Sequence, residues 1–96
     1  MENIENIKPN TPITLFDNKS NESKLISLSI TNEDKSRQCL LELFIENNKN
    51  NSRQVVERRM LNAEENFKLN SYLVNKDTKY IAIVSHCQIK INLRFN

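Results

Sequence analysis

The sequence predicts an all-β protein, an antiparallel β-sandwich of about seven or eight short strands that is either Ig-like or jelly-roll-like. Three observations predict it. Apolar and polar residues alternate almost without interruption from Phe67 to Phe95. Short polar segments separate the alternating runs, and a chain of 96 residues is long enough for one domain. A period of two buries one face of each strand, which is how a two-layer sandwich is built.

The first residues predict a flexible arm followed by the sandwich. Residues 1–11 are mostly polar and contain Pro9, with Pro12 just beyond, and the two prolines favour an extended segment. We therefore expect an N-terminal arm over residues 1–11 and a single β-sandwich domain over residues 12–96. Ile4 and Ile7 leave open whether the arm docks on the domain or stays loose.

Three strands are predicted in the first half of the chain. Residues 13–16 suggest a short strand, and residues 24–31 alternate with isoleucine and leucine on one face and serine and threonine on the other. Residues 37–46 form the most apolar segment, with Leu40 and Phe44 on the face opposite its other apolar residues. A strand that is apolar on both faces lies centrally in a sheet or meets another subunit.

Residues 53–69 fit two structures. Val56, Met60, Ala63 and Phe67 recur at helical spacing, and the segment is rich in good helix formers. However, Ser52 is not followed by a glutamate or glutamine at the capping position, and no glycine or proline marks a helix end. The pattern alone leaves helix and strand open.

The last segment predicts a β-hairpin. Residues 79–85 and 88–95 alternate and are separated by His86-Cys87, where we expect the turn. Tyr80, Ala82 and Val84 share one face of the first strand, and Ile81 and Ile83 share the other. This strand is also predicted to be central, so Tyr80 joins Leu40 and Phe44 as a possible subunit-interface residue. The polar residues 75–78 predict the preceding turn.

The composition excludes several kinds of function. The chain has no glycine and sixteen asparagines, so asparagine must occupy the positive-φ positions of turns, and no glycine-rich phosphate loop can form. The net charge of +2 comes from 14 basic and 12 acidic residues, a balance that does not argue for a nucleic-acid partner, and we expect no membrane partner. Residues 1–4 lack the apolar run of a secretion signal.

The potential chemical groups are few. His86 and Cys87 are adjacent, and Cys39 is the only other cysteine. Structural zinc needs four ligands in paired spacing, which this sequence does not provide. We expect no metal, no cofactor, no small-molecule substrate and no enzymatic activity. Cys39 is expected as a small core residue, and whether it pairs with Cys87 stays open.

Arg53, Arg58 and Arg59 form the densest basic cluster. One interpretation is a contact with a phosphate or an acidic partner. The other is a solvated strand face on which the arginines pair across strands with acids such as Glu42 or Glu46.

The order of elements resembles a known family. In residues 67–85 an alternating strand is followed by a polar turn ending at Asp77 and by a second strand ending at Ser85. This order resembles a signature of small virion proteins of tailed bacteriophages, which are β-sandwiches of about this length. Residues 24–32 and 41–45 resemble the first paired strands of those proteins. The chain departs from the signature at Lys76, where the family has glycine.

The resemblance implies a non-enzymatic structural role in a bacteriophage virion, as a capsid decoration protein, a neck or tail adaptor, or a fibre attachment protein. It implies a homo-oligomer that assembles in the host cytoplasm with other virion structural proteins, and it favours strand over helix for residues 53–61. The alternative is a small α+β module with a helix over residues 54–69 that binds a protein or nucleic acid through Arg53, Arg58 and Arg59.

Overall fold

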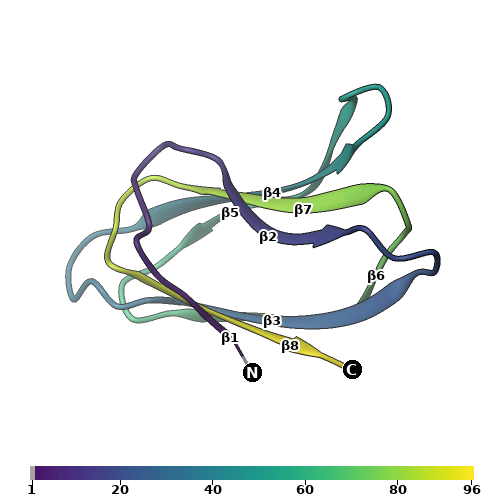
Figure 1. Ribbon diagram of the computed structural model, residues 1–96. Helices are drawn as coiled ribbons and strands as arrows, with labels where there is room; N and C mark the ends of the chain where they lie inside the picture. Colours follow the sequence, from purple (N-terminus) through teal and green to yellow (C-terminus); the bar gives the residue numbers. More distant parts are fainter. Residues whose placement is uncertain (1) are drawn as a thin grey trace.

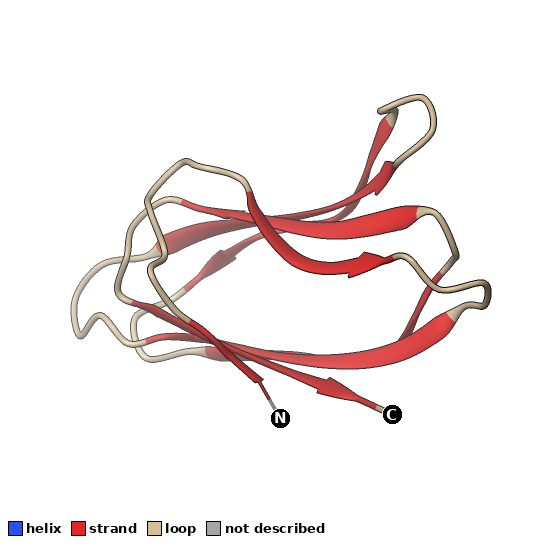
Figure 2. Ribbon diagram, in the orientation of Figure 1, coloured by secondary structure: helices blue, strands red, loops and turns tan. Residues whose placement is uncertain are grey.

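The computed structural model describes residues 2–96, with side chains from residue 3 onward, and these residues form strands and loops without a helix (Figure 2). The strands are β1 (Glu2–Ile4), β2 (Ile13–Asn18), β3 (Lys24–Asn32), β4 (Cys39–Asn47), β5 (Arg53–Leu61), β6 (Asn66–Val74), β7 (Thr78–Val84) and β8 (Ile89–Phe95). The all-β prediction is confirmed. The α+β alternative is wrong, because residues 54–69 belong to β5, β6 and the loop between them.

The strands form two antiparallel sheets that face each other as two layers (Figure 1). Sheet A has the order β1-β8-β3-β6 and is the lower layer in Figure 1, and sheet B has the order β2-β7-β4-β5. In an immunoglobulin domain the first two strands are neighbours in one sheet. Here consecutive strands lie in different sheets except for β4 and β5, as in an eight-stranded jelly roll, so the second of the two predicted sandwich types is the one observed.

The predicted final hairpin is wrong. β7 lies in sheet B and β8 in sheet A, so residues 85–88 cross between the layers instead of turning back within one sheet. The expected pairing of residues 24–32 with residues 41–45 is wrong for the same reason, since β3 and β4 lie in different sheets. β4 and β5 form the one hairpin of the described chain, and its tip projects beyond the body of the sandwich (Figure 1). The predicted central position of β4 and β7 is confirmed.

The core lies between the two sheets and follows the alternation of the sequence. Sheet A contributes the inward residues of β3 and β8, such as Ile26, Ile30 and Leu93, which are fully buried. Sheet B contributes Leu41 and Leu43 from β4, together with alternate residues of β7. Since hydrophobic burial is the main force that holds two layers together, this alternation accounts for the packing of the sheets.

Part of the predicted arm lies along the domain. β1 pairs with β8, with Ile4 opposite Ile91. Ile4 and Ile7 are half-buried and pack against the core. The backbone N–H of Asn10 donates to the carbonyl oxygen of Val84 at 2.7 Å. These contacts hold the described part of residues 1–11 against both sheets.

Two buried asparagines fix the crossing loops. Asn18, the last residue of β2, donates from Nδ2 to the carbonyl oxygens of Glu22 and Val74 at 3.0 and 2.9 Å. Asn32, the last residue of β3, donates to the carbonyl oxygens of Arg37, Leu61 and Asn62 at 2.8 to 3.3 Å. Both side chains are almost completely buried. Each amide therefore bonds a carbonyl group of its own loop and a carbonyl group at the end of another strand, and so joins the two.

Positive backbone φ angles confirm the role expected for asparagine only in part. Asn6, Asn10 and Asn51 have φ between 56° and 59°, but Glu64, Ser71 and Asp77 also lie in this region. The turn expected over residues 75–78 is present, and its positive φ falls on Asp77 rather than on Lys76. Lysine at position 76 is therefore compatible with this turn, because it does not adopt the left-handed conformation there.

We predict that Asn32→Ala lowers the free energy of unfolding by about 3 kcal/mol, because it removes three hydrogen bonds of a buried amide, each worth about 1 kcal/mol. Urea denaturation followed by circular dichroism measures the change. Asn50→Ala, on the exposed tip of the β4–β5 hairpin, is the control and should cost less than about 1 kcal/mol. A loss at Asn32 no larger than at Asn50 would show that the amide does not fix the loops.

Candidate functional site

The outer face of sheet B carries an ordered array of apolar and charged residues. Leu41 and Leu43 point into the core, so Leu40, Glu42, Phe44 and Glu46 project from the opposite face of β4. On β5 their partners in register are Met60, Arg58, Val55 and Arg53. On β7, Ile83 lies beside Glu42, and Ile81 lies beside Phe44. We call the residues Leu40, Phe44, Val55, Met60, Ile81 and Ile83 the outer apolar strip.

The outer apolar strip is separate from the core. Phe44 and Ile81 are buried but do not belong to the core cluster, because they lie on the far side of sheet B and are covered by their surface neighbours. Leu40 is half-buried, whereas Val55 and Met60 are 48% and 50% exposed. The strip thus continues outward from Phe44 and Leu40 onto the edge strand β5.

The structure corrects one predicted interface residue. Leu40 and Phe44 lie on the outer face, as their opposition to the core residues of β4 implies. Tyr80 is fully buried between the sheets and opposite Ile45, so it cannot meet another subunit. The reason is that β7 is apolar on both faces, and the sequence does not say which face is the inner one. The outer residues of β7 are Ile81 and Ile83.

The three arginines do not form one cluster. Arg58 Nε lies 2.7 Å from Glu42 Oε2, and Arg53 Nη2 lies 3.0 Å from Glu46 Oε1. These are the cross-strand pairs of the second interpretation. Arg53 also lies over the ring of Phe44, with 5.4 Å between its guanidinium carbon and the ring centroid. Arg59 points the other way, over the ring of Phe67 at 4.6 Å.

The sequence prediction missed Val55 and Met60. Both fall in the segment that fits helix or strand, and only the strand in its observed register places them opposite Phe44 and Leu40. A β-bulge between Leu43 and Phe44 shifts this register by one residue, so simple alternation along residues 53–61 would not have placed both on one face.

Tyr80 has an unusual environment inside the sandwich. Its ring meets the ring of Tyr72 edge to face, with centroids 5.0 Å apart. Its hydroxyl is enclosed and has no hydrogen-bond partner among the residues that the structure describes. Burial raises the pKa of Tyr80 well above its usual range, and the nearby Tyr72 and Glu57 raise it further. The hydroxyl is therefore neutral, and it makes no hydrogen bond that would offset the free-energy cost of removing it from water.

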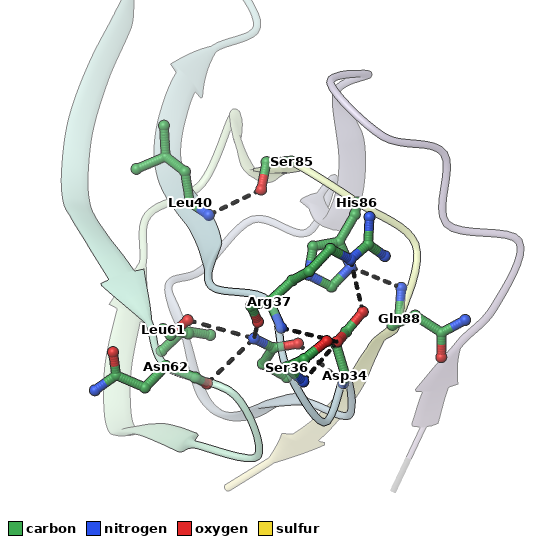
Figure 3. Close-up of polar contacts among 10 residues, drawn as sticks. Asp34, Ser36, Arg37, Leu40, Leu61, Asn62, Ser85, His86 and Gln88 are labelled. Atoms are coloured by element: carbon green, nitrogen blue, oxygen red, sulfur yellow. Dashed lines mark hydrogen bonds and ion pairs between the residues drawn. The ribbon is translucent and has the colours of Figure 1, made fainter.

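His86 lies where three loops meet at one end of the sandwich (Figure 3). It is buried, its Nδ1 accepts a hydrogen bond from the backbone N–H of Gln88 at 3.1 Å, and its Nε2 has no partner among the described residues. In the neighbouring loop, Asp34 accepts bonds from the backbone N–H of Ser36 and from the backbone and side chain of Arg37. These bonds hold the pKa of Asp34 well below its usual value.

The cysteines do not pair. Cys39 is buried in the core, as predicted, and Cys87 is exposed, and both are free thiols. Within residues 2–96 no three residues of histidine, cysteine, aspartate or glutamate come together in a way that could hold a metal ion. Over the same range no helix is long and apolar enough to cross a membrane.

Comparisons of the chain with models of protein families, with curated proteins and with solved structures found no match. The outer face of sheet B must therefore be interpreted from its own geometry. Its groups are suited to contact, since Glu42 and Glu46 are paired with arginines and apolar residues lie beside these pairs on β4, β5 and β7.

We predict that Tyr80→Phe raises the free energy of unfolding by about 1 kcal/mol, because it removes an enclosed hydroxyl that has no partner and keeps the ring packing. Urea denaturation measures the change. Tyr72→Phe, at the less buried partner ring, should change stability by less than about 0.5 kcal/mol. A clear loss of stability in Tyr80→Phe would mean that the hydroxyl makes a bond that this structure lacks.

We predict that Asp34 contributes to stability at neutral pH and not in acid. Its pKa is lowered in the folded protein, so the contribution is present above the unfolded pKa of about 4 and is lost as the pH falls below it. Asp34→Asn should therefore be less stable than the native protein near pH 6, with a smaller further loss on acidification. Urea denaturation of the native protein and of Asp34→Asn, near pH 6 and again below about pH 4, tests this. Glu33→Gln is the control, because the Glu33 side chain makes no described hydrogen bond. Its free energy of unfolding should change between the two pH values as much as that of the native protein.

Proposed function

We propose that this domain is a non-enzymatic structural protein of a bacteriophage virion that acts by assembling into oligomers, as a capsid decoration protein, a neck or tail adaptor, or a fibre attachment protein. Two observations support the role. The strand order is that of the jelly roll, a fold used by viral capsid domains. The order of residues 67–85 resembles that of small virion proteins of tailed bacteriophages.

The observation that carries the proposal is the outer apolar strip on sheet B. Isolated exposed apolar residues are common on monomers, but here they continue across neighbouring strands from buried Phe44 and Ile81 to half-exposed Val55 and Met60. Charged pairs separate the apolar rows. Apolar anchors between polar groups are typical of the surfaces on which subunits meet.

The charges on this face favour a second copy of the chain as the occupant. The acids Glu42 and Glu46 lie on β4, and the bases Arg58 and Arg53 lie in the same rows on β5. A two-fold axis between the two strands, parallel to them, would place β4 of one copy over β5 of the other. Each of these acids would then face a base of the partner, Leu40 would face Met60 and Phe44 would face Val55, whereas Ile81 and Ile83 of β7 would lie beside this contact. The face is thus self-complementary, as an isologous interface requires.

We predict that charge reversal will separate and then re-form the dimer. In Glu42→Arg and in Arg58→Glu, like charges face each other across the two-fold axis, so each variant alone should be monomeric at micromolar concentration. An equal mixture of the two variants places arginine opposite glutamate at both contacts between positions 42 and 58, so it should form a heterodimer. Analytical ultracentrifugation measures all three samples.

Lys76→Glu, in the β6–β7 turn and away from this face, is the control and should associate as the native chain does. A native chain that stays monomeric at these concentrations, or a mixture that stays monomeric, would contradict assembly through sheet B. The virion role has its own test. The gene should lie among portal, capsid or tail genes, and a location among unrelated metabolic genes would count against it.

A further inference from the structure

The outer face of sheet A is hollowed along its middle strand. Ser27 and Ser29 are the small outward residues of β3, and longer side chains rise on both sides of them, from β8 and from β6. A hollow of about 250 Å³ lies between these walls, and its floor is the backbone at Leu28 and Leu93, whose side chains are buried. The lining side chains are Ser27, Ser29, Lys68, Asn70, Asn92 and Arg94.

Both ends of the hollow are held by hydrogen bonds between side chains. At one end a bulge in the β3–β6 pairing places Ser71 at a φ of 55°, and its N–H donates to Ser27 Oγ at 3.2 Å. Ser27 Oγ donates to Asn96 Oδ1, and Asn96 Nδ2 donates to Ser71 Oγ, both at 3.1 Å. At the other end Asn66 Nδ2 donates to Ser29 Oγ at 2.9 Å. The hollow is therefore a formed feature of the folded sheet.

The charge of the hollow is positive. Lys68 lies on the β6 side in the row of Ser29, and Arg94 lies on the β8 side in the row of Ser27, so the two cations stand diagonally across it. The lining contains no carboxylate. Neither cation makes an ion pair with any side chain that the structure describes, whereas Arg53 and Arg58 on sheet B both pair with acids. A negatively charged group of a ligand would give the two cations the ion-pair partner that they lack.

The uncharged groups of the hollow favour a ligand with hydroxyls. The hydroxyl of Ser29 and the amides of Asn70 and Asn92 can donate hydrogen bonds. No aromatic ring lines the hollow, and proteins that bind single-stranded nucleic acid usually stack its bases on such rings.

From these groups we propose that the outer face of sheet A binds an acidic saccharide, with Lys68 and Arg94 holding its anionic substituents and Ser29, Asn70 and Asn92 holding its hydroxyls. The inference does not rest on the assembly through sheet B, because the two sites lie on opposite outer faces of the sandwich (Figure 1). The anionic substituent is a carboxylate or a sulfate, and the choice of probes separates these two.

Binding of four probes to the full chain, measured by isothermal titration calorimetry, tests the proposal. The probes are oligogalacturonate, sulfated dextran, neutral dextran, and a DNA duplex of similar charge. We expect binding of oligogalacturonate, of sulfated dextran or of both, with neutral dextran and DNA at least about tenfold weaker. Equal binding of DNA would overturn the saccharide assignment, and so would failure of both acidic saccharides to bind.

Variants test whether this hollow is the site. Lys68→Glu and Arg94→Glu should each weaken binding of the acidic saccharide by about tenfold or more. Asn92→Leu, which keeps the charge, should weaken it severalfold. Lys35→Glu is the matched control, since Lys35 is exposed in the β3–β4 loop and outside the lining. If Lys35→Glu weakens binding as much as Lys68→Glu does, the attraction is only that of net charge and the site is wrong.

Discussion

The structure depends on burying one face of each sheet. The chain achieves this while it crosses from one sheet to the other after almost every strand. Of the seven connections between consecutive strands, only the one from β4 to β5 stays within a sheet. The layers are therefore joined by six crossing loops as well as by the apolar core. A crossing loop leaves the backbone hydrogen bonding of its sheet, so its carbonyl and N–H groups need other partners. Asn18 and Asn32 provide such partners at the ends of β2 and β3, where their side chains are enclosed.

Asparagine and aspartate also form many of the turns in this chain, which contains no glycine. Side-chain oxygens of Asn18, Asn32, Asp34, Asn47 and Asn50 each accept a bond from the backbone N–H two residues on, which is the Asx turn. Such turns reverse the chain without a glycine. The positive φ angles at Glu64 and Ser71 show that asparagine does not occupy every left-handed position. At Ser71 the position belongs to the bulge that shapes the hollow on sheet A.

The sequence allows the strands to be predicted but not their partners. The alternation of residues 24–31 and 37–46 places β3 and β4 to within about two residues, because burial of every second side chain leaves a direct trace in the sequence. Alternation indicates that one face of a strand is buried, but it does not indicate to which sheet the strand belongs. The connection between β7 and β8 is short enough for either a hairpin or a crossing, and for that reason the predicted hairpin failed. Tyr80 was misplaced because both faces of its strand are apolar, so only the packed structure identifies the inner one.

The two outer faces differ in a way that makes the two proposals compatible. Sheet B presents apolar rows with paired charges, whereas sheet A presents hydroxyls, amides and unpaired cations. If two copies meet through sheet B, their A sheets point away from each other, and both hollows stay open. A dimer would then carry two saccharide sites on opposite surfaces, and a larger assembly would carry more. Sites that are weak one by one bind a repeating polymer tightly when many are joined, so assembly through one face would strengthen binding at the other.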